Sequence, residues 1–171
     1  MKKIYRILII IFIILVLFLT LSYFKEKNKI KREWEQVKFD FEIVNNFLID
    51  YYDKNCFIDC IEEENMYFDI NIEDSKVKLS VNHGKNIFEV DDQLKKSMLN
   101  ISEYYIHKVS GFSDTLDYIR VKKQTIEYAS ELHSPKVIYY KEKKPSLNEI
   151  HENKLERLSD NWYKTEYEHH L

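Results

Sequence analysis

Hydrophobic residues form one long run near the start of the chain and then recur at helical or strand spacing. Residues 7–24 (ILIIIFIILVLFLTLSYF) carry no charge. At the rise of an α-helix this run spans about 27 Å, close to the hydrocarbon thickness of a bilayer. The pattern predicts a single transmembrane helix at residues 1–24, because no comparable run follows it.

Residues 30–51 place apolar side chains at alternating steps of four and three residues, which is typical of one face of a helix. The residues on this face are Ile30, Trp34, Val37, Phe41, Val44, Leu48 and Tyr51. We interpret the segment as a helix packed on the sheet of its own domain, because the face is aromatic rather than rich in Leu and Ile. The alternative is a coiled-coil seam that dimerises the protein.

Strand patterns follow in the second third of the chain. Apolar and polar residues alternate in 66–72 and again in 77–81, which predicts a β-hairpin with one buried face. Residues 117–130 also alternate, but their parity changes near 122–124, which predicts a tight turn or a bulge. Residues 136–140 and 161–167 read as two further short strands.

Two more helices are predicted between these strands. Asp91 and Asp92 offer an N-cap to a helix that runs to about Val109 and ends before Gly111. Residues 147–158 form a short amphipathic pattern. The order of elements predicts an α+β domain, in which a long N-terminal helix and a second helix pack on a mostly antiparallel sheet. We expect an anchor at 1–24, a juxtamembrane amphipathic helix at 25–55 and the α+β domain at 56–171.

The charges beside the apolar run give conflicting indications of topology. Three basic residues precede it, which fits an uncleaved signal anchor with the N-terminus inside. Five basic residues follow it in KEKNKIKR, and the positive-inside rule would place that side in the cytoplasm. We expect a retained single-pass anchor in the cell membrane with the C-terminal domain on the extracytoplasmic side.

Composition narrows the classes of function. After residue 24 the chain has 23 basic and 29 acidic residues, a net charge of −6, which argues against nucleic acid as a partner. With two glycines in the whole chain there is no glycine-rich loop to hold a phosphate. We expect no cofactor, no metal and no catalytic residue, because the histidines and acidic clusters match no ligand spacing.

Cys56 and Cys60 are the two cysteines of the chain. Their C-x3-C spacing is one residue longer than the redox motif C-x2-C. We predict a disulfide between them, which requires a turned or helical CFIDC segment that brings the Cα atoms within about 7 Å. The alternatives are two reduced thiols in the core or a functional site.

Adjacent aromatic residues supply the best indication of a partner surface. On a strand, neighbouring side chains point to opposite faces, so one residue of each pair is expected in the core and the other on the surface. Tyr140 and Tyr163 are the resulting candidates, because exposed Tyr is favoured at protein interfaces.

The sequence therefore favours a non-enzymatic, membrane-anchored domain that binds a protein partner outside the cytoplasm. One alternative is a hydrolase that acts on the cell envelope. The other is a regulatory module tethered to the membrane on its cytoplasmic side.

Overall fold

The structure is a computed structural model. It describes residues 2–59, 65–73, 76–81, 86–88, 90–110, 115–130 and 135–165. The chain divides into two compact units, Met1–Gln36 and Val37–Leu171. The second unit begins inside the first helix, whose residues from Val37 onward contribute side chains to the core.

Helix α1 spans Lys2–Asp59 without a break. In the first unit, the apolar side chains from Ile11 to Leu19, together with Leu21, Tyr23 and Phe24, are exposed. Within the described residues, no helix has an apolar stretch long enough to cross a membrane, so the transmembrane part of the prediction is unsupported. The side chains of residues 7–10, which belong to the predicted anchor, lie outside the described set.

In the second unit, α1 presents the predicted apolar face to the sheet. Val37, Phe41, Val44 and Leu48 are buried, and Tyr52 replaces the expected Tyr51 at the end of the face. The ring of Phe41 lies 4.8 Å from that of Tyr128 and 5.0 Å from that of Trp162, measured between centroids. Both partners are strand residues, so the first interpretation, a helix packed on its own sheet, is confirmed.

Among the described residues, eight strands form one antiparallel sheet in the order β3-β2-β1-β4-β5-β6-β8-β7. The bounds are β1 Met66–Glu73, β2 Lys76–Val81, β3 Asn86–Phe88, β4 Tyr118–Val121, β5 Thr125–Ala129, β6 Val137–Tyr140, β7 Leu155–Arg157 and β8 Trp162–Thr165. The predicted hairpin is β1–β2, and the parity change at 122–124 is the turn between β4 and β5. The α+β fold with an antiparallel sheet is confirmed.

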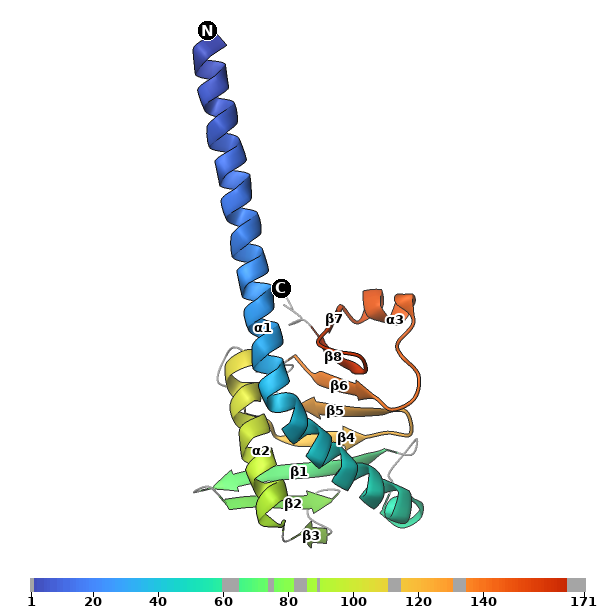
Figure 1. Ribbon diagram of the computed structural model, residues 1–171. Helices are drawn as coiled ribbons and strands as arrows, with labels where there is room; N and C mark the ends of the chain where they lie inside the picture. The colour runs from blue at the N-terminus through green and yellow to red at the C-terminus, as the bar shows by residue number, and fades with distance from the viewer. Residues whose placement is uncertain are drawn as a thin grey trace. The chain divides into compact units, whose positions relative to one another are not determined.

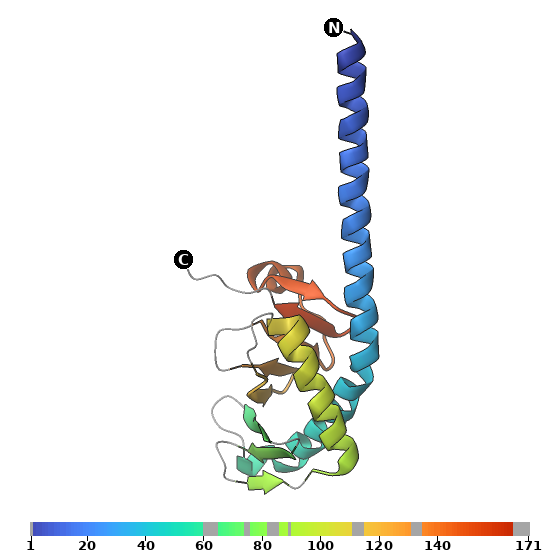
Figure 2. The ribbon, with the colours of Figure 1, turned by 90° about the vertical axis from the view of Figure 1, so that its left-hand side faces the viewer.

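Helix α2 covers Asp92–Tyr104 and continues as a π-helical segment, Tyr105–Ser110. The side chain of Asp91 accepts a hydrogen bond of 2.7 Å from the backbone amide of Leu94, as expected of an N-cap. Helix α2 and the second half of α1 lie on the same face of the sheet (Figures 1 and 2). The two helices predicted to pack on the sheet therefore do so side by side.

Buried polar contacts join the helices to the strands. The hydroxyl of Tyr128 on β5 donates to Oδ1 of Asn45 on α1 at 2.6 Å, and both residues are buried. The hydroxyl of Tyr105 donates to the carbonyl of Pro135 at 2.7 Å and accepts from the amide of Ser130 at 3.1 Å. These bonds satisfy hydroxyls that would otherwise be costly to bury.

The prediction of one helix over 147–158 is wrong in its second half. Helix α3 covers only Leu147–Glu152. Ser146 forms a capping box before its first residue, and Asn153 is its C-cap. Lys154 then adopts a positive φ of 45°, which a helix cannot continue, and Leu155 starts strand β7. Strand β3 was not predicted either, because three residues are too few to show an alternating pattern.

Candidate functional site

The face of the sheet opposite α1 and α2 is here called the outer face, and a row of side chains crosses it. Successive strand pairs place Tyr67 beside Arg120, Arg120 beside Glu127, Glu127 beside Ile138 and Ile138 beside Tyr163. Side chains paired across antiparallel strands share a face. The row therefore begins as a polar cluster on β1, β4 and β5 and ends as an apolar one on β6 and β8.

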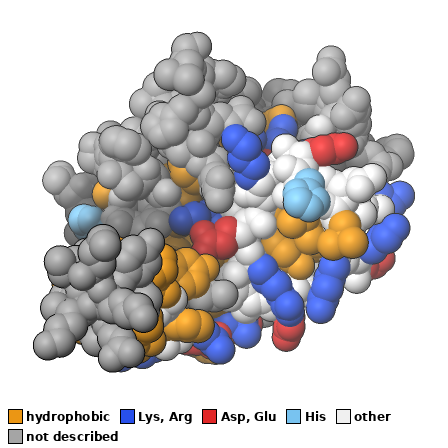
Figure 3. Space-filling view, turned by 90° about the horizontal axis from the view of Figure 1, so that it is seen from above, with side chains coloured by type: hydrophobic (Ala, Val, Ile, Leu, Met, Phe, Trp, Pro, Cys, Tyr) orange, Lys and Arg blue, Asp and Glu red, His pale blue; other side chains and the backbone are white. Residues whose placement is uncertain are grey.

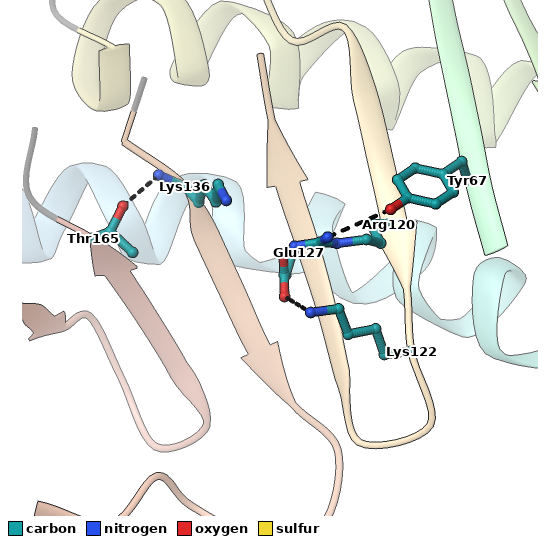
Figure 4. A network of polar contacts seen from close by, with 6 residues as sticks. All are labelled: Tyr67, Arg120, Lys122, Glu127, Lys136 and Thr165. Atoms are coloured by element: carbon teal, nitrogen blue, oxygen red, sulfur yellow. Dashed lines mark hydrogen bonds and ion pairs between the residues drawn. The ribbon is translucent and has the colours of Figure 1, made fainter. Parts of the chain in front are cut away.

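Arg120 is the centre of the polar cluster (Figure 4). Its guanidinium donates to one carboxylate oxygen of Glu127 through Nε at 3.1 Å and through Nη2, and it reaches the hydroxyl of Tyr67 at 3.4 Å. The guanidinium carbon also lies 5.9 Å from the centroid of the Tyr67 ring. Nζ of Lys122 lies 2.7 Å from the other oxygen of Glu127. One carboxylate thus holds two cations in place.

Burial and the neighbouring charged groups shift the pKa values of Glu127 and Arg120 in opposite directions. Burial raises the pKa of Glu127, but hydrogen bonds from Lys122 and Arg120 outweigh it and leave the pKa below its ordinary value. Burial lowers the pKa of Arg120, but its bonds to Glu127 and Tyr67 raise it more. Burial is also the main reason that the pKa of the neighbouring Tyr118 is raised. At neutral pH Arg120 is therefore a guanidinium cation, Glu127 a carboxylate and Tyr118 a neutral phenol.

The apolar end of the outer face is a second, smaller core. Ile138, Leu155 and Tyr163 are buried together, and Tyr140 and Ile150 pack against them. The expectation that Tyr163 is exposed is wrong, because only 4% of it is accessible. Strand β7 and helix α3 contribute Leu155 and Ile150 to this core, so both residues of the Trp162–Tyr163 pair are buried.

Tyr140, the other predicted contact residue, keeps partial exposure beside this core. Its ring meets that of Tyr163 edge-on, with centroids 5.5 Å apart. Burial, together with the nearby carboxylate of Glu149, raises the pKa of the Tyr140 hydroxyl. Tyr140 therefore remains a candidate for contact, with Tyr163 as its support.

The structure describes only Cys56 of the two cysteines in the predicted disulfide. Cys56 lies in the last turns of α1 and is disulfide-bonded. Cys60 lies outside the described residues, so the pairing of the two cysteines stays a prediction.

An open cleft of about 590 Å³ lies beside Cys56, where the C-terminal end of α1 meets the β4–β5 turn and the end of β6. Its walls include Tyr52, Asp53, Lys123, Tyr139, Lys141 and Glu142. Nζ of Lys141 lies 4.5 Å from the centroid of the Tyr52 ring, within the range of a cation–π interaction. Burial lowers the pKa of Lys141, although Asp53 and Glu142 oppose this shift.

Sequence reasoning missed the polar cluster and the cleft. One signal for the cluster was present: a two-residue turn at Lys123–Gln124 pairs Arg120 with Glu127 by simple counting along the hairpin. No comparable signal marks the cleft, since its walls come from segments far apart in the chain.

Among the residues that the structure describes, no group of three or more His, Cys, Asp or Glu side chains is arranged to hold a metal ion. In the space-filling view, hydrophobic side chains lie beside lysine and arginine side chains on the surface (Figure 3). Comparison of the chain with known protein families, with curated proteins and with solved structures finds no match.

Proposed function

We propose that this protein is a membrane-tethered, non-enzymatic domain that binds a protein partner through the outer face of its sheet. The observation that carries the proposal is the ordered cluster of Tyr67, Tyr118, Arg120 and Glu127. Tyr and Arg are the residue types that contribute most to binding at protein interfaces. In this cluster they stand on neighbouring strands with their rings and guanidinium in fixed positions.

Side chains that are already held in place in the free protein lose less conformational entropy when a partner binds. A long side chain that becomes immobilised at an interface costs about 0.5–1.5 kcal/mol. Arg120 is already held by Glu127 and Tyr67, and the rings of Tyr67 and Tyr118 lie 6.1 Å apart. Much of that cost is thus met on folding. Arg120 also keeps 23% of its side chain exposed, so it is accessible for further contacts.

The tether is proposed from the first unit of the chain. Residues 7–24 carry no charge, and the side chains of its apolar residues from Ile11 to Phe24 are exposed to solvent. Exposed apolar side chains in such number need a covering, and we propose lipid, because the uncharged run of residues 7–24 in the sequence has about the length that spans a bilayer. We place the remaining chain outside the cytoplasm, with the N-terminal basic residues inside.

Site-specific photo-crosslinking in intact cells tests the binding proposal. A benzoylphenylalanine replaces Tyr118 or Tyr140, and the matched control carries it at Glu103, an exposed position on α2. We expect one discrete protein adduct from the two outer-face positions and none from the control. Adding Arg120→Ala is expected to reduce the adduct, because it removes the cation and frees the Tyr67 ring.

Two results would contradict the proposal. One is an absence of any adduct from both outer-face positions in cells that produce the folded protein. The other is an adduct of equal yield from the control position. Circular dichroism of each purified variant separates loss of binding from loss of fold.

The side of the membrane is tested by labelling Cys56 and Cys60 on intact cells with a membrane-impermeant maleimide. Labelling that requires an impermeant reductant is expected, because the domain is proposed to lie outside with an oxidised pair. Protection of the domain from protease added to intact cells, with digestion only after lysis, would place it in the cytoplasm instead.

A further inference from the structure

The apolar run of the first unit ends in two aromatic residues. Tyr23 and Phe24 are both exposed, and their rings meet edge-on with centroids 6.1 Å apart. Tyr5 lies near the other end of the run, 18 residues before Tyr23, which is about 27 Å along an α-helix. Tyrosine is enriched where the hydrocarbon of a bilayer meets its head groups. The spacing of Tyr5 and Tyr23 therefore matches the two boundaries of a bilayer core.

Three basic residues of α1, here called the basic stripe, follow directly after Phe24. Lys25, Lys29 and Arg32 are exposed and stand four and three residues apart, so they project from one side of the helix. Trp34 is buried and lies nine residues, or two and a half turns, after Lys25, so it projects from the opposite side. The basic stripe therefore faces away from the packed side of α1.

The basic stripe lies in a segment with an excess of positive charge. Residues 25–32 contain five basic residues and one acidic residue, and two glutamates come in the next turn. Farther along α1, Lys38 and Lys54 each pair with a carboxylate one turn away. Within the described residues, no ion pair includes a member of the stripe, and Nε of Arg32 donates to the backbone carbonyl of Asn28 at 3.3 Å. The charges of the stripe are therefore available to an anionic group.

The position of the stripe indicates which anionic group meets it. Lys29 lies about 8 Å from Phe24 along the helix axis, and Arg32 about 12 Å. Each head-group layer of a bilayer is roughly 5–8 Å thick. Side chains on a helix lean toward its N-terminus, so these long side chains extend back toward the apolar run. The cations are thus held at the depth of lipid phosphates when the apolar run lies in lipid.

We infer that the basic stripe binds the phosphate groups of anionic lipids at the membrane surface, with Tyr23 and Phe24 at the boundary of the hydrocarbon. The inference rests on the proposed tether and adds the class of lipid that it selects. Segments of this kind are attracted to anionic leaflets, and each cation near the surface contributes. Flanks outside the cytoplasm usually carry few basic residues, so lipid binding also accounts for the five found in residues 25–32.

The test measures the lipid selectivity of the full-length protein reconstituted in phosphatidylcholine bilayers, by electron paramagnetic resonance of spin-labelled lipids. The fraction of label slowed by the protein is compared between phosphatidylglycerol and phosphatidylcholine. The wild type is expected to favour phosphatidylglycerol at least about threefold. The variant Lys25→Gln/Lys29→Gln/Arg32→Gln removes three charges and keeps helix-forming side chains. This variant is expected to lose at least about half of the preference.

The matched control is Lys76→Gln/Lys78→Gln/Lys96→Gln, which removes three exposed lysines of β2 and α2. We expect it to keep the preference of the wild type. Equal selectivity of the wild type for the two lipids would overturn the inference, as would an equal loss in both variants. A preference that persists in about 0.5 M NaCl would also overturn it, because salt screens exposed charges. Displacement of the labelled lipid by millimolar inorganic phosphate at constant ionic strength would assign the stripe to a free anion instead.

Extraction of membranes with alkaline carbonate reports on the tether separately. If the wild type resists extraction but shows no preference for phosphatidylglycerol, the proposed function stands and this inference alone falls. Release of the wild type by carbonate would remove the tether and the inference together.

Discussion

Replacing Glu127 by Gln tests whether the buried carboxylate stabilises the outer face through its charge. Glu127 keeps only 9% of its side chain exposed and faces Arg120 and Lys122, whose side chains are 23% and 35% exposed. Gln preserves the shape and removes the charge. The two cations then lie close together without a counterion.

The expected magnitude follows from the geometry. Unit charges 2.7 Å apart, the distance from Nζ of Lys122 to Oε1 of Glu127, attract by about 6 kcal/mol at an effective dielectric constant of about 20. The cost of desolvating the carboxylate offsets much of this attraction. Breaking a fully buried pair costs about 3–5 kcal/mol, and partial exposure of both cations lowers this to about 2–3 kcal/mol.

The effect also has a defined pH dependence. The pKa of Glu127 is lower in the folded protein than its ordinary value of 4.5. The group therefore contributes stability above that value, and the contribution is lost as pH falls through the folded-state pKa. At pH 7 the Gln variant is expected to be less stable by the full amount, and near pH 3 the difference is expected to shrink.

The free energy of unfolding is measured by urea denaturation of the full-length protein in mild detergent, with tryptophan fluorescence as the signal. The control is Glu156→Gln, since Glu156 is 47% exposed and lies 3.7 Å from Lys164. An exposed pair of this kind is expected to change the free energy of unfolding by less than about 0.5 kcal/mol. Equal stability of wild type and Glu127→Gln at pH 7 would refute the reasoning, and a difference undiminished at low pH would assign the effect to packing.

Three further substitutions test the local structure by the same unfolding assay. Tyr128→Phe is expected to cost about 1–3 kcal/mol, because it leaves the buried Oδ1 of Asn45 without its donor; an effect below about 0.5 kcal/mol would count against that bond. Ser146→Ala removes the hydroxyl that caps α3 by accepting from the amide of Glu149, and a loss of about 0.5–2 kcal/mol is expected. Lys154→Gly is expected to be neutral or stabilising by up to about 1 kcal/mol, because φ is positive there and Gly adopts it without strain; clear destabilisation would contradict this.

The sequence by itself determined the elements whose periodic pattern is long enough to be read. Helical spacing identified the buried face of α1 from Val37 to Leu48, and alternation identified the β1–β2 hairpin. The cap at Asp91 located the start of α2. These features follow from local chemistry, because a helix or strand repeats its orientation every few residues.

Tertiary structure decided what covers each face. Alternation predicted opposite faces for Trp162 and Tyr163, but only the return of Leu155 and Ile150 over β6 and β8 buries Tyr163 as well. The helix predicted for residues 147–158 ends at Glu152. Leu155 instead begins strand β7, which pairs with β8 at the edge of the sheet, and its side chain is buried there.

The candidate sites depend on contacts between segments that are distant in the chain. Tyr67 meets Arg120 across the β1–β4 pair, and Tyr52 meets Lys141 where α1 ends beside β6. No local pattern encodes such encounters, since they arise from the order of strands in the sheet and the position of the helices on it. The sequence therefore determined the elements of the fold, and their packing decided which polar side chains stand together.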